Sequence, residues 1–447
     1  MSLPAQTLAV RLPRALLDPG GHPNATPLPA GDAEGLLSVT LTVADGRIAA
    51  IEPRQPSSSG EATRMEALPL ALPPLLEPHA HLDKAFSWTD FPNRDGSMAG
   101  ALEANTREAA VRSTALVLER GERALDQAWR YGLRALRSHI DSGGPQEQPS
   151  WEALLELQQR WDGRLALQLT ALVPLAHWAT AEGEALARRV AAAGGLLGGV
   201  LGPPFSEGYS HGDQLQHLLQ LADRHGCGLD LHIDESDRQP GRGLRLLLRE
   251  LKRSPVAVPI TCSHCSSLAL LPEEQQRRLA AGLAERNVAV VVLPTTNLWM
   301  LGRRHGLTGP LRPIAPLKLL QQEGVCAAIG GDNVQDPWYP GGDFDPVELL
   351  RLSLPALQLP PWLRQGLMPF TTAASRLLGL DWDGVLRPGG PADLLVLGAS
   401  SWSELLARPT QRRVLRAGRW LEPPHSQRPD PRLASLGQTP PQRRLMR

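Results

Sequence analysis

Two histidines one residue apart, His79 and His81, stand in the stretch LLEPHAHLDKAF, directly after an apolar run. In an extended strand alternate residues project to the same side, so both imidazoles can face one point. Imidazole nitrogens are common ligands of divalent transition metals. The pair therefore indicates half of a metal site, although either histidine alone is also compatible with a polar loop or a buried core position.

Further histidines and carboxylates stand where other apolar runs end. They are His139, Asp141, His232, Glu235, His264 and Asp332. If these run ends meet in space, three histidines and one carboxylate form a ligand set that suits Zn²⁺ or Fe²⁺. The chemistry indicated is that of a metal-assisted reaction, with further acids or bases beside the ion.

The elements that must position these residues are short apolar runs that alternate with helical patterns. Candidate strands cover residues 70–76, 133–139, 165–173, 195–201, 228–232, 256–261, 287–293 and 325–329, and helical segments include 101–130, 181–193, 213–225, 242–253, 272–285 and 313–323. Eight strands that alternate with helices predict an α/β fold with a parallel (β/α)₈ barrel. Such barrels carry their chemistry at the carboxyl ends of the strands, where the polar residues above fall.

Both ends of the chain have the pattern of β structure. Residues 36–52 alternate apolar and polar side chains around Asp45-Gly46, a typical hairpin turn, and residues 392–400 and 412–422 have the pattern of short strands. The last segment, 423–447, is rich in proline, arginine and glutamine, which predicts a disordered tail.

Composition excludes several classes of protein. The 46 lysines and arginines balance the 46 aspartates and glutamates, so charge gives no reason to expect nucleic acid or an anionic membrane as partner. The apolar runs are far shorter than the roughly 20 residues of a membrane span, and the first residues lack the pattern of a secretion signal. We expect a cytoplasmic protein with a small-molecule substrate, and the sequence leaves a homo-oligomer open.

The four cysteines are too few for a disulfide framework. Cys262 and Cys265 form a C-x-x-C without a second pair, which favours small residues in a core strand and the following turn over a metal or redox site. The zinc deaminases of the cytidine type are excluded, because their H-x-E motif is absent.

Taken together, the motifs resemble the amidohydrolase superfamily and, within it, the cytosine deaminase group. The resemblance covers nearly the whole chain through PPLLEPHAHLDK, RSHID, LDLHIDESD, TCSHC and GDNVQDPWYPGG, of which HIDE and D-x-x-x-DPWYP are the most specific. It implies that residues 1–68 and 388–422 together form a small β-sandwich beside a barrel of residues 69–387.

The resemblance also implies a mechanism. One divalent ion, Fe²⁺ or Zn²⁺, would be held by His79, His81, His232 and Asp332, and the reaction would be hydrolytic deamination of cytosine or a related aminated heterocycle. Three residues would be catalytic. Asp332 would accept the proton of the attacking water, His264 would orient that water and stabilise the tetrahedral intermediate, and Glu235 would carry a proton to the ring and the leaving amine. Asp234 is a rival for the last role.

A single metal is expected because binuclear relatives usually bridge two ions through a carboxylated lysine on a middle strand. The chain has three lysines, Lys84, Lys252 and Lys318, and none lies in the third or fourth predicted strand. For Lys84 two interpretations stay open, an ion pair with a loop carboxylate and a solvated surface side chain.

The substrate-binding positions depart from the cytosine deaminase pattern. A glutamine is expected after the third strand, where this chain has Pro174 or Leu175, and an aspartate after Asp332, where it has Asn333. Trp338 either stacks on a flat ring or packs structurally. The candidate substrate-binding residues are therefore Leu175, Asn333 and Trp338. The resemblance predicts the type of reaction better than it predicts the substrate, and a triazine-like amine stays open as a substrate.

Two other classes of function compete with the deaminase. One is a different amidohydrolase, such as an N-substituted amine hydrolase or a cyclic amidase, which the missing middle-strand lysine disfavours. The other is a non-catalytic binding protein on the same barrel. It is the least favoured, because a degenerate copy would usually have lost a metal ligand and here the full set is present.

Overall fold

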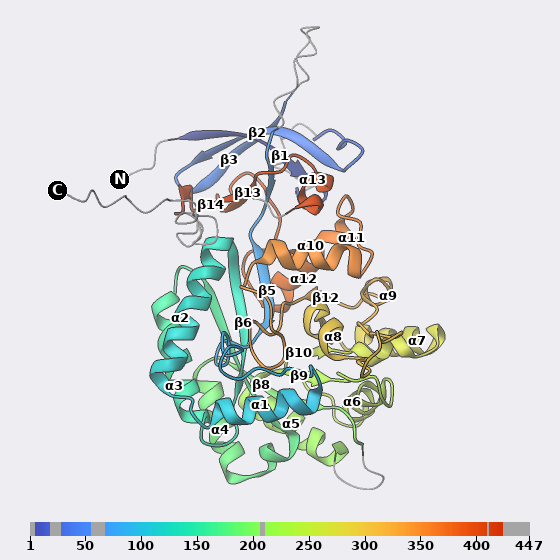
Figure 1. The fold of residues 1–447 in the computed structure, drawn as a ribbon. Coiled ribbons are helices and arrows are strands. Elements are labelled where there is room, and N and C mark those ends of the chain that lie inside the picture. Colours follow the sequence, from blue (N-terminus) through green and yellow to red (C-terminus); the bar gives the residue numbers. More distant parts are fainter. Residues whose placement is uncertain (1–4, 18–27, 55–67, 206–210, 409–410, 423–447) are drawn as a thin grey trace, which may run out of the picture.

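The structure, a computed structural model, describes residues 5–17, 28–54, 68–205, 211–408 and 411–422. Two sheets organise them (Figure 1), one with eight strands and one with seven. The segment 423–447, predicted to be a disordered tail, lies outside the described residues.

The eight-stranded sheet is parallel, and each strand pairs with the next one along the chain. Its strands are β5 (Leu75–Ala80), β6 (Leu133–Asp141), β7 (Ala166–Pro174), β8 (Leu196–Leu201), β9 (Gly228–Ile233), β10 (Ile260–His264), β11 (Ala289–Val292) and β12 (Ala327–Ile329). Beyond β12, the Asp332 amide donates to the carbonyl oxygen of His79 at 2.9 Å, so the sheet nearly closes on β5. The predicted (β/α)₈ barrel is confirmed.

Helices follow the barrel strands and surround the barrel (Figure 1). They are α1 (Met98–Ala109), α2 (Thr114–Tyr131), α3 (Glu147–Trp161), α4 (Ala181–Ala192), α5 (His211–His225), α6 (Arg242–Arg253), α7 (Glu273–Glu285), α8 (Pro294–Met300), α9 (Leu317–Gln322), α10 (Pro346–Ala356), α11 (Arg364–Leu367) and α12 (Thr372–Leu377), with short 3₁₀ helices at Arg14–Leu16, Leu175–Ala179, Ser266–Leu270 and Met368–Phe370. Within the described part of the chain, none of the helices has the length and apolar character needed to cross a membrane.

The seven-stranded sheet joins the two ends of the chain, as predicted, and lies beside the barrel with its blue and red strands together (Figure 1). Its order is β15 (Arg419–Trp420), β14 (Arg412–Arg416), β13 (Leu394–Leu397), β4 (Leu70–Leu72), β1 (Gln6–Pro13), β2 (Leu36–Ala44) and β3 (Arg47–Pro53), with α13 (Trp402–Ala407) between β13 and β14. Its own apolar core includes Val39, Leu41, Ile48 and Leu394. The exact boundaries 1–68, 69–387 and 388–422 stay a prediction.

The predicted first strand, 70–76, is wrong as one element. Residues Leu70–Leu72 form β4 of the terminal sheet, whereas Leu75–Ala80 form β5 of the barrel. Pro73 and Pro74 separate the two because proline offers no N–H to a sheet. The sixth predicted strand, 256–261, starts later, at Ile260, directly after Pro259.

The predicted helix 101–130 is also wrong as one element, since it consists of α1 and α2. The break has two local causes. The Arg112 side chain is buried in ion pairs, one of them with Glu108, and the Ser113 hydroxyl accepts the Leu116 amide at 3.3 Å as the N-cap of α2.

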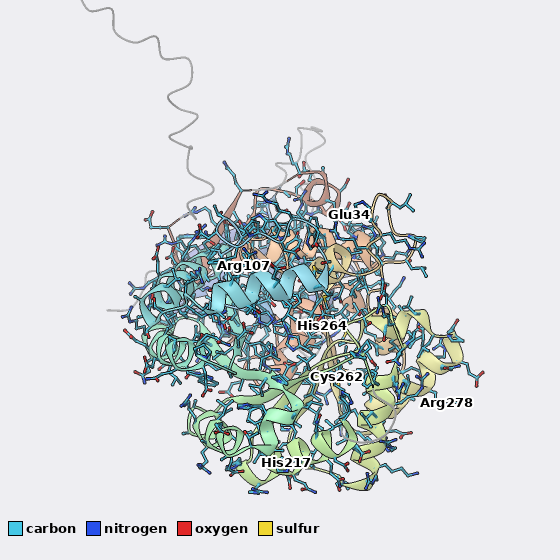
Figure 2. All side chains as sticks on the ribbon, turned by 60° about the horizontal axis from the view of Figure 1, so that its bottom comes forward. Glu34, Arg107, His217, Cys262, His264 and Arg278 are labelled. Carbon is cyan, nitrogen blue, oxygen red and sulfur yellow. The ribbon has the colours of Figure 1, made fainter. Side chains whose placement is uncertain are left out.

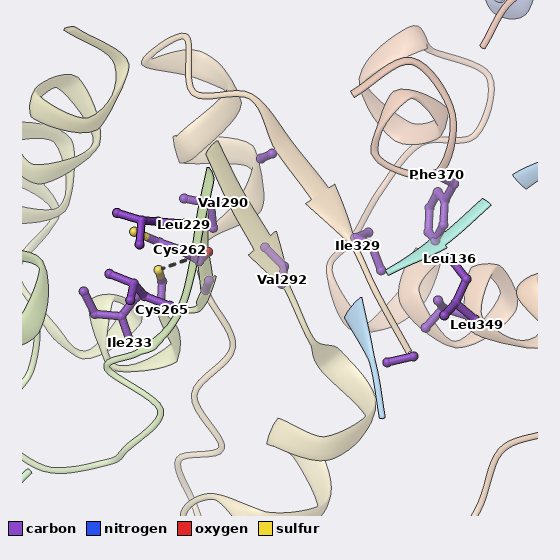
Figure 3. Close-up of a cluster of buried hydrophobic side chains, with 14 of the residues drawn as sticks. Leu136, Leu229, Ile233, Cys262, Cys265, Val290, Val292, Ile329, Leu349 and Phe370 are labelled. Carbon is purple, nitrogen blue, oxygen red and sulfur yellow. Dashed lines mark hydrogen bonds between the residues drawn. The ribbon is translucent and has the colours of Figure 1, made fainter. Parts of the chain in front are cut away.

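The C-x-x-C pair lies in the core, as predicted. Cys262 on β10 and Cys265 in the turn after it are fully buried free thiols. Figure 3 shows them among Leu229, Ile233 and Val290, with the Cys265 thiol directed at the carbonyl oxygen of Cys262. Apolar packing accounts for both residues.

Candidate active site

Four side chains from three strand ends meet at one mouth of the barrel. His79 and His81 come from the end of β5, His232 from β9, and Asp332 from the segment after β12. The Oδ1 atom of Asp332 lies 3.5 Å from His79 Nε2 and 3.3 Å from His81 Nε2. One ring nitrogen from each of the three histidines lies within 4.8 Å of the others. We call these four residues the ligand cluster.

The ligand cluster fits a divalent metal because its polar atoms are buried and unsatisfied. Among the described residues, His79 Nε2, His81 Nδ1, His232 Nδ1 and both carboxylate oxygens of Asp332 have no hydrogen-bond partner. Buried polar atoms without a partner are costly, so a group of neighbouring side chains that carries several of them fits a bound cation. Nitrogen and carboxylate oxygen are the donors that Zn²⁺ and Fe²⁺ accept.

A buried relay orients His79. Its Nδ1 atom lies 2.8 Å from the Ser263 hydroxyl, which donates to Asp230 at 2.7 Å, while Arg137 donates to the other oxygen of Asp230 at 2.7 Å. Because the hydroxyl proton points to Asp230, Ser263 accepts the Nδ1–H of His79, which leaves Nε2 as an unprotonated ligand. His139 stacks on His79, with ring centroids 3.8 Å apart, and does not line the cavity described below.

The sequence patterns above did not predict this relay. Arg137 and Asp230 are charged residues inside predicted strands, and that placement is the signal that could have found them.

Glu77 holds the segment that carries the aspartate. Its carboxylate accepts the Gly331 amide at 2.9 Å and the His79 amide at 3.1 Å, and burial raises its pKa to about 8. A Cβ atom on Gly331 would lie 2.8 Å from this carboxylate, so the tight fit requires glycine. Asp332 then adopts a φ of +66°, a conformation that non-glycine residues rarely take outside functional sites. The role of Glu77 was also missed.

His264 lies in the interior of the barrel next to Glu235. Figure 2 shows it near the middle of the molecule, whereas Arg278 lies at the periphery. The Nδ1 atom of His264 is 3.1 Å from Asn297 Nδ2 and 3.4 Å from Glu235 Oε1. Because the Asn297 amide donates to Nδ1, the proton of the neutral ring is on Nε2, which has no partner among the described residues.

Glu235 and its rival Asp234 point in different directions. The Asp234 carboxylate accepts the amides of Gly243 and Leu244 at 2.8 and 3.0 Å and so caps the start of α6. Glu235 lines the cavity instead. Burial, together with the charge of Asp332, raises the pKa of Glu235 well above its ordinary value. This carboxyl group is suited to hold a proton near neutral pH.

A cavity of about 520 Å³ opens beside the ligand cluster. Its lining combines polar groups, including His81, His232, Glu235, His264, Asp332 and Lys84, with apolar side chains, including Met98, Leu102, Leu172 and Val200. The three predicted substrate-binding residues, Leu175, Asn333 and Trp338, all line it. Leu175 is buried, and the indole Nε1 of half-buried Trp338 has no partner among the described residues.

Lys84 belongs to a buried ionic network at the edge of the same cavity. Its ammonium group donates to Asp141 Oδ1 at 2.7 Å. We call the residues joined by these ion pairs the ionic network; they are Lys84, Asp141, Arg112, Asp83, Glu108 and Arg120. Of the two sequence-based interpretations of Lys84, the ion pair is confirmed, although its carboxylate, Asp141, ends strand β6 and is not in a loop, and the solvated side chain is wrong.

Comparisons with known proteins agree with this fold. Residues 122–420 match the amidohydrolase family. A pterin deaminase of Rhizobium rhizogenes is 35% identical over 398 residues, which is 87% of this chain and 89% of that protein. An N-isopropylammelide isopropyl amidohydrolase of a Pseudomonas species is 22% identical over 343 residues, 74% of this chain and 80% of that protein.

Two solved structures have similar folds. The 5-methylcytosine deaminase of Klebsiella pneumoniae superimposes with a TM-score of 0.73 at 24% identity, covering 87% of this chain and 95% of that one. The N-isopropylammelide isopropylaminohydrolase of Burkholderia multivorans gives 0.67 at 25% identity, covering 92% and 98%. From the sequence match over two thirds of its length and the 35% identical relative, the chain belongs to the amidohydrolase family.

Proposed function

We propose that this protein is a metal-dependent hydrolytic deaminase of a fused, aminated heterocycle of the pterin class. The observation that carries the proposal is the group of unsatisfied polar atoms in the ligand cluster beside Glu235, which lines the same cavity. The extensive similarity to a pterin deaminase supports the substrate class.

The ligand cluster would hold one Fe²⁺ or Zn²⁺ ion. A divalent ion in such a site lowers the pKa of water towards about 7 and so makes a hydroxide nucleophile available near neutral pH. The protein's own groups would do the rest. Asp332 would accept a water proton. Burial raises its pKa, but its contact with His81 and the charge of His264 bring that pKa below the ordinary value, so the side chain is an ionised carboxylate. The His264 Nε2–H would donate to the developing oxyanion.

Glu235 would move the second proton. Its raised pKa keeps it protonated, so it can protonate the ring nitrogen next to the aminated carbon as the new C–O bond forms. The C–N bond then breaks: the amine takes up the proton that Asp332 accepted from water and leaves as ammonia, and the new hydroxyl group returns a proton to Glu235 as the carbonyl forms. The balance is one water consumed, one carbonyl formed and one ammonia released.

The cavity walls support a bicyclic substrate over cytosine. A cytosine site needs a partner for the polar edge of the pyrimidine, and the Leu175 side chain cannot hydrogen-bond. A cavity of about 520 Å³ with apolar walls accommodates a second ring and buries its faces, for which Trp338 offers a stacking surface.

The experiment is an ammonia-release screen with pterin, guanine, isocytosine, cytosine and aminotriazines. We expect the largest kcat/KM for pterin. Glu235→Gln should lower kcat by roughly 10²- to 10⁴-fold while metal content stays unchanged, because the variant cannot carry the proton. Glu273→Gln, at an exposed position on α7, is the matched control. Full activity of Glu235→Gln would exclude the proton-transfer role, and ammonia from cytosine alone would exclude the substrate class.

A second candidate function is hydrolysis of an N-alkylated triazine amine. It is favoured by the structural similarity to the Burkholderia multivorans enzyme and by the apolar side chains of Met98, Leu102 and Val200 around the cavity, which suit an alkyl group. Release of isopropylamine from N-isopropylammelide, faster than release of ammonia from pterin, would select it.

A further inference from the structure

Lys84 carries a charge that the proposed chemistry does not use. Its side chain is 3% exposed and forms part of the cavity wall, as do His81 and Glu235. Burial lowers the pKa of Lys84, but the carboxylates of Asp141 and Asp83 bring it above the ordinary value. The side chain is therefore an ammonium group.

The ammonium group has hydrogen-bond donors to spare. It carries three N–H groups, and a single protein acceptor, Asp141 Oδ1 at 2.7 Å, faces it among the described residues. The other oxygen of Asp141 is engaged by Asn105 at 3.2 Å and by Arg112 at 3.3 Å, so the carboxylate is anchored. The result is a fixed cation with two donors left over at the cavity wall.

The charges of the network cancel. Its cations are Lys84, Arg112 and Arg120, and its anions are Asp83, Asp141 and Glu108. No positive charge is left over to neutralise an anionic substituent, so the free N–H groups suit neutral acceptors, such as carbonyl oxygens and ring nitrogens.

We propose that Lys84 is a specificity residue that recognises two adjacent acceptors on one edge of a fused ring, a carbonyl oxygen and the nearest nitrogen of the second ring. Pterin and guanine both present such a pair, whereas cytosine and isocytosine lack the second ring. Lysine recognises the same pair when it contacts guanine in DNA. The inference rests on the proposed function and deepens it, since it names the feature by which a bicyclic substrate is selected.

The test uses ligand pairs that differ in one atom. 5-Deazapterin replaces the relevant pterin nitrogen by CH, and 7-deazaguanine does the same for guanine. Binding is measured by fluorescence or calorimetry on two metal-loaded proteins, Glu235→Gln and Glu235→Gln with Lys84→Met. The Glu235→Gln substitution is present in both so that the ligands are not consumed. The exposed Lys252→Met on α6 is the matched control.

We expect the deaza change to weaken pterin binding about tenfold when Lys84 is present, because a hydrogen bond to a charged group is lost. In the Lys84→Met background the same change should have less than about a twofold effect, and in Lys252→Met the full effect should persist. In the active enzyme, Lys84→Met should raise KM for pterin and leave kcat nearly unchanged, which a general loss of structure would not do.

The outcomes separate the two proposals. Pterin deamination without a deaza effect in the protein that retains Lys84 leaves the function standing and overturns the role of Lys84, and this comparison needs no variant at Lys84. An equal deaza effect with and without Lys84 also overturns it. A Lys84-dependent effect for guanine in a protein that does not deaminate pterin supports the recognised edge and overturns the pterin assignment.

Discussion

Two groups of buried polar side chains share one mouth of the barrel and differ in how they are satisfied. In the ionic network, each charged group has an oppositely charged partner within 3.3 Å. In the ligand cluster, ring nitrogens and both oxygens of Asp332 lack hydrogen-bond partners among the described residues. A buried charged group that has an ion-pair partner needs no ligand to offset the cost of its burial, whereas a buried polar group without a partner does. The difference separates the part that shapes the cavity from the part that holds an ion.

Removing a ligand should give the largest effect on activity. His232→Ala should lose most of the bound metal and lower kcat/KM by at least about a thousandfold, because the nucleophile depends on the ion. Metal analysis and the ammonia assay measure this, with His305→Ala at an exposed position as control. Retention of one metal per chain and of activity would remove His232 from the ligand cluster, and two ions per chain would contradict the single-metal proposal.

Breaking the network should affect stability instead. Glu108→Ala leaves Arg112 and Arg120 without their shared carboxylate, and the free energy of unfolding should fall by about 3–5 kcal/mol. Denaturant titration measures the loss. Glu103→Ala, on the exposed side of the same helix, should change it by less than about 0.5 kcal/mol. If Glu108→Ala lost metal but no stability, the division between the two groups would be wrong.

Loosening the relay should give the smallest effect. Ser263→Ala removes the group that sets the tautomer of His79, so metal affinity should fall by roughly 10- to 100-fold while the fold stays intact. Competition with a chelator gives the affinity, and Ser263→Thr, which restores a hydroxyl, should recover part of it. Unchanged affinity in Ser263→Ala would mean that neighbouring contacts suffice to orient the ring.

Sequence patterns predicted the barrel and the approximate position of most strands because each strand is an apolar run that ends in polar residues. They failed where proline intervened, at Pro73-Pro74 and at Pro259, and where the buried Arg112 lies in the break between α1 and α2. The contacts of Glu77 and Ser263 could not be predicted, since their partners Gly331 and His79 stand 254 and 184 positions away along the chain.

The sequence by itself determined that His79, His81, His232, Glu235, His264 and Asp332 lie at or shortly after the ends of strands, because local patterns of apolar and polar residues indicate where strands end. Only the tertiary structure decided which polar groups are satisfied. It turned Asp234 to the start of a helix and Glu235 to the cavity, and it buried Lys84 against Asp141. Whether a buried polar group has a hydrogen-bond or ion-pair partner depends on residues that closure of the barrel brings together from distant strands. No local sequence pattern encodes these pairings.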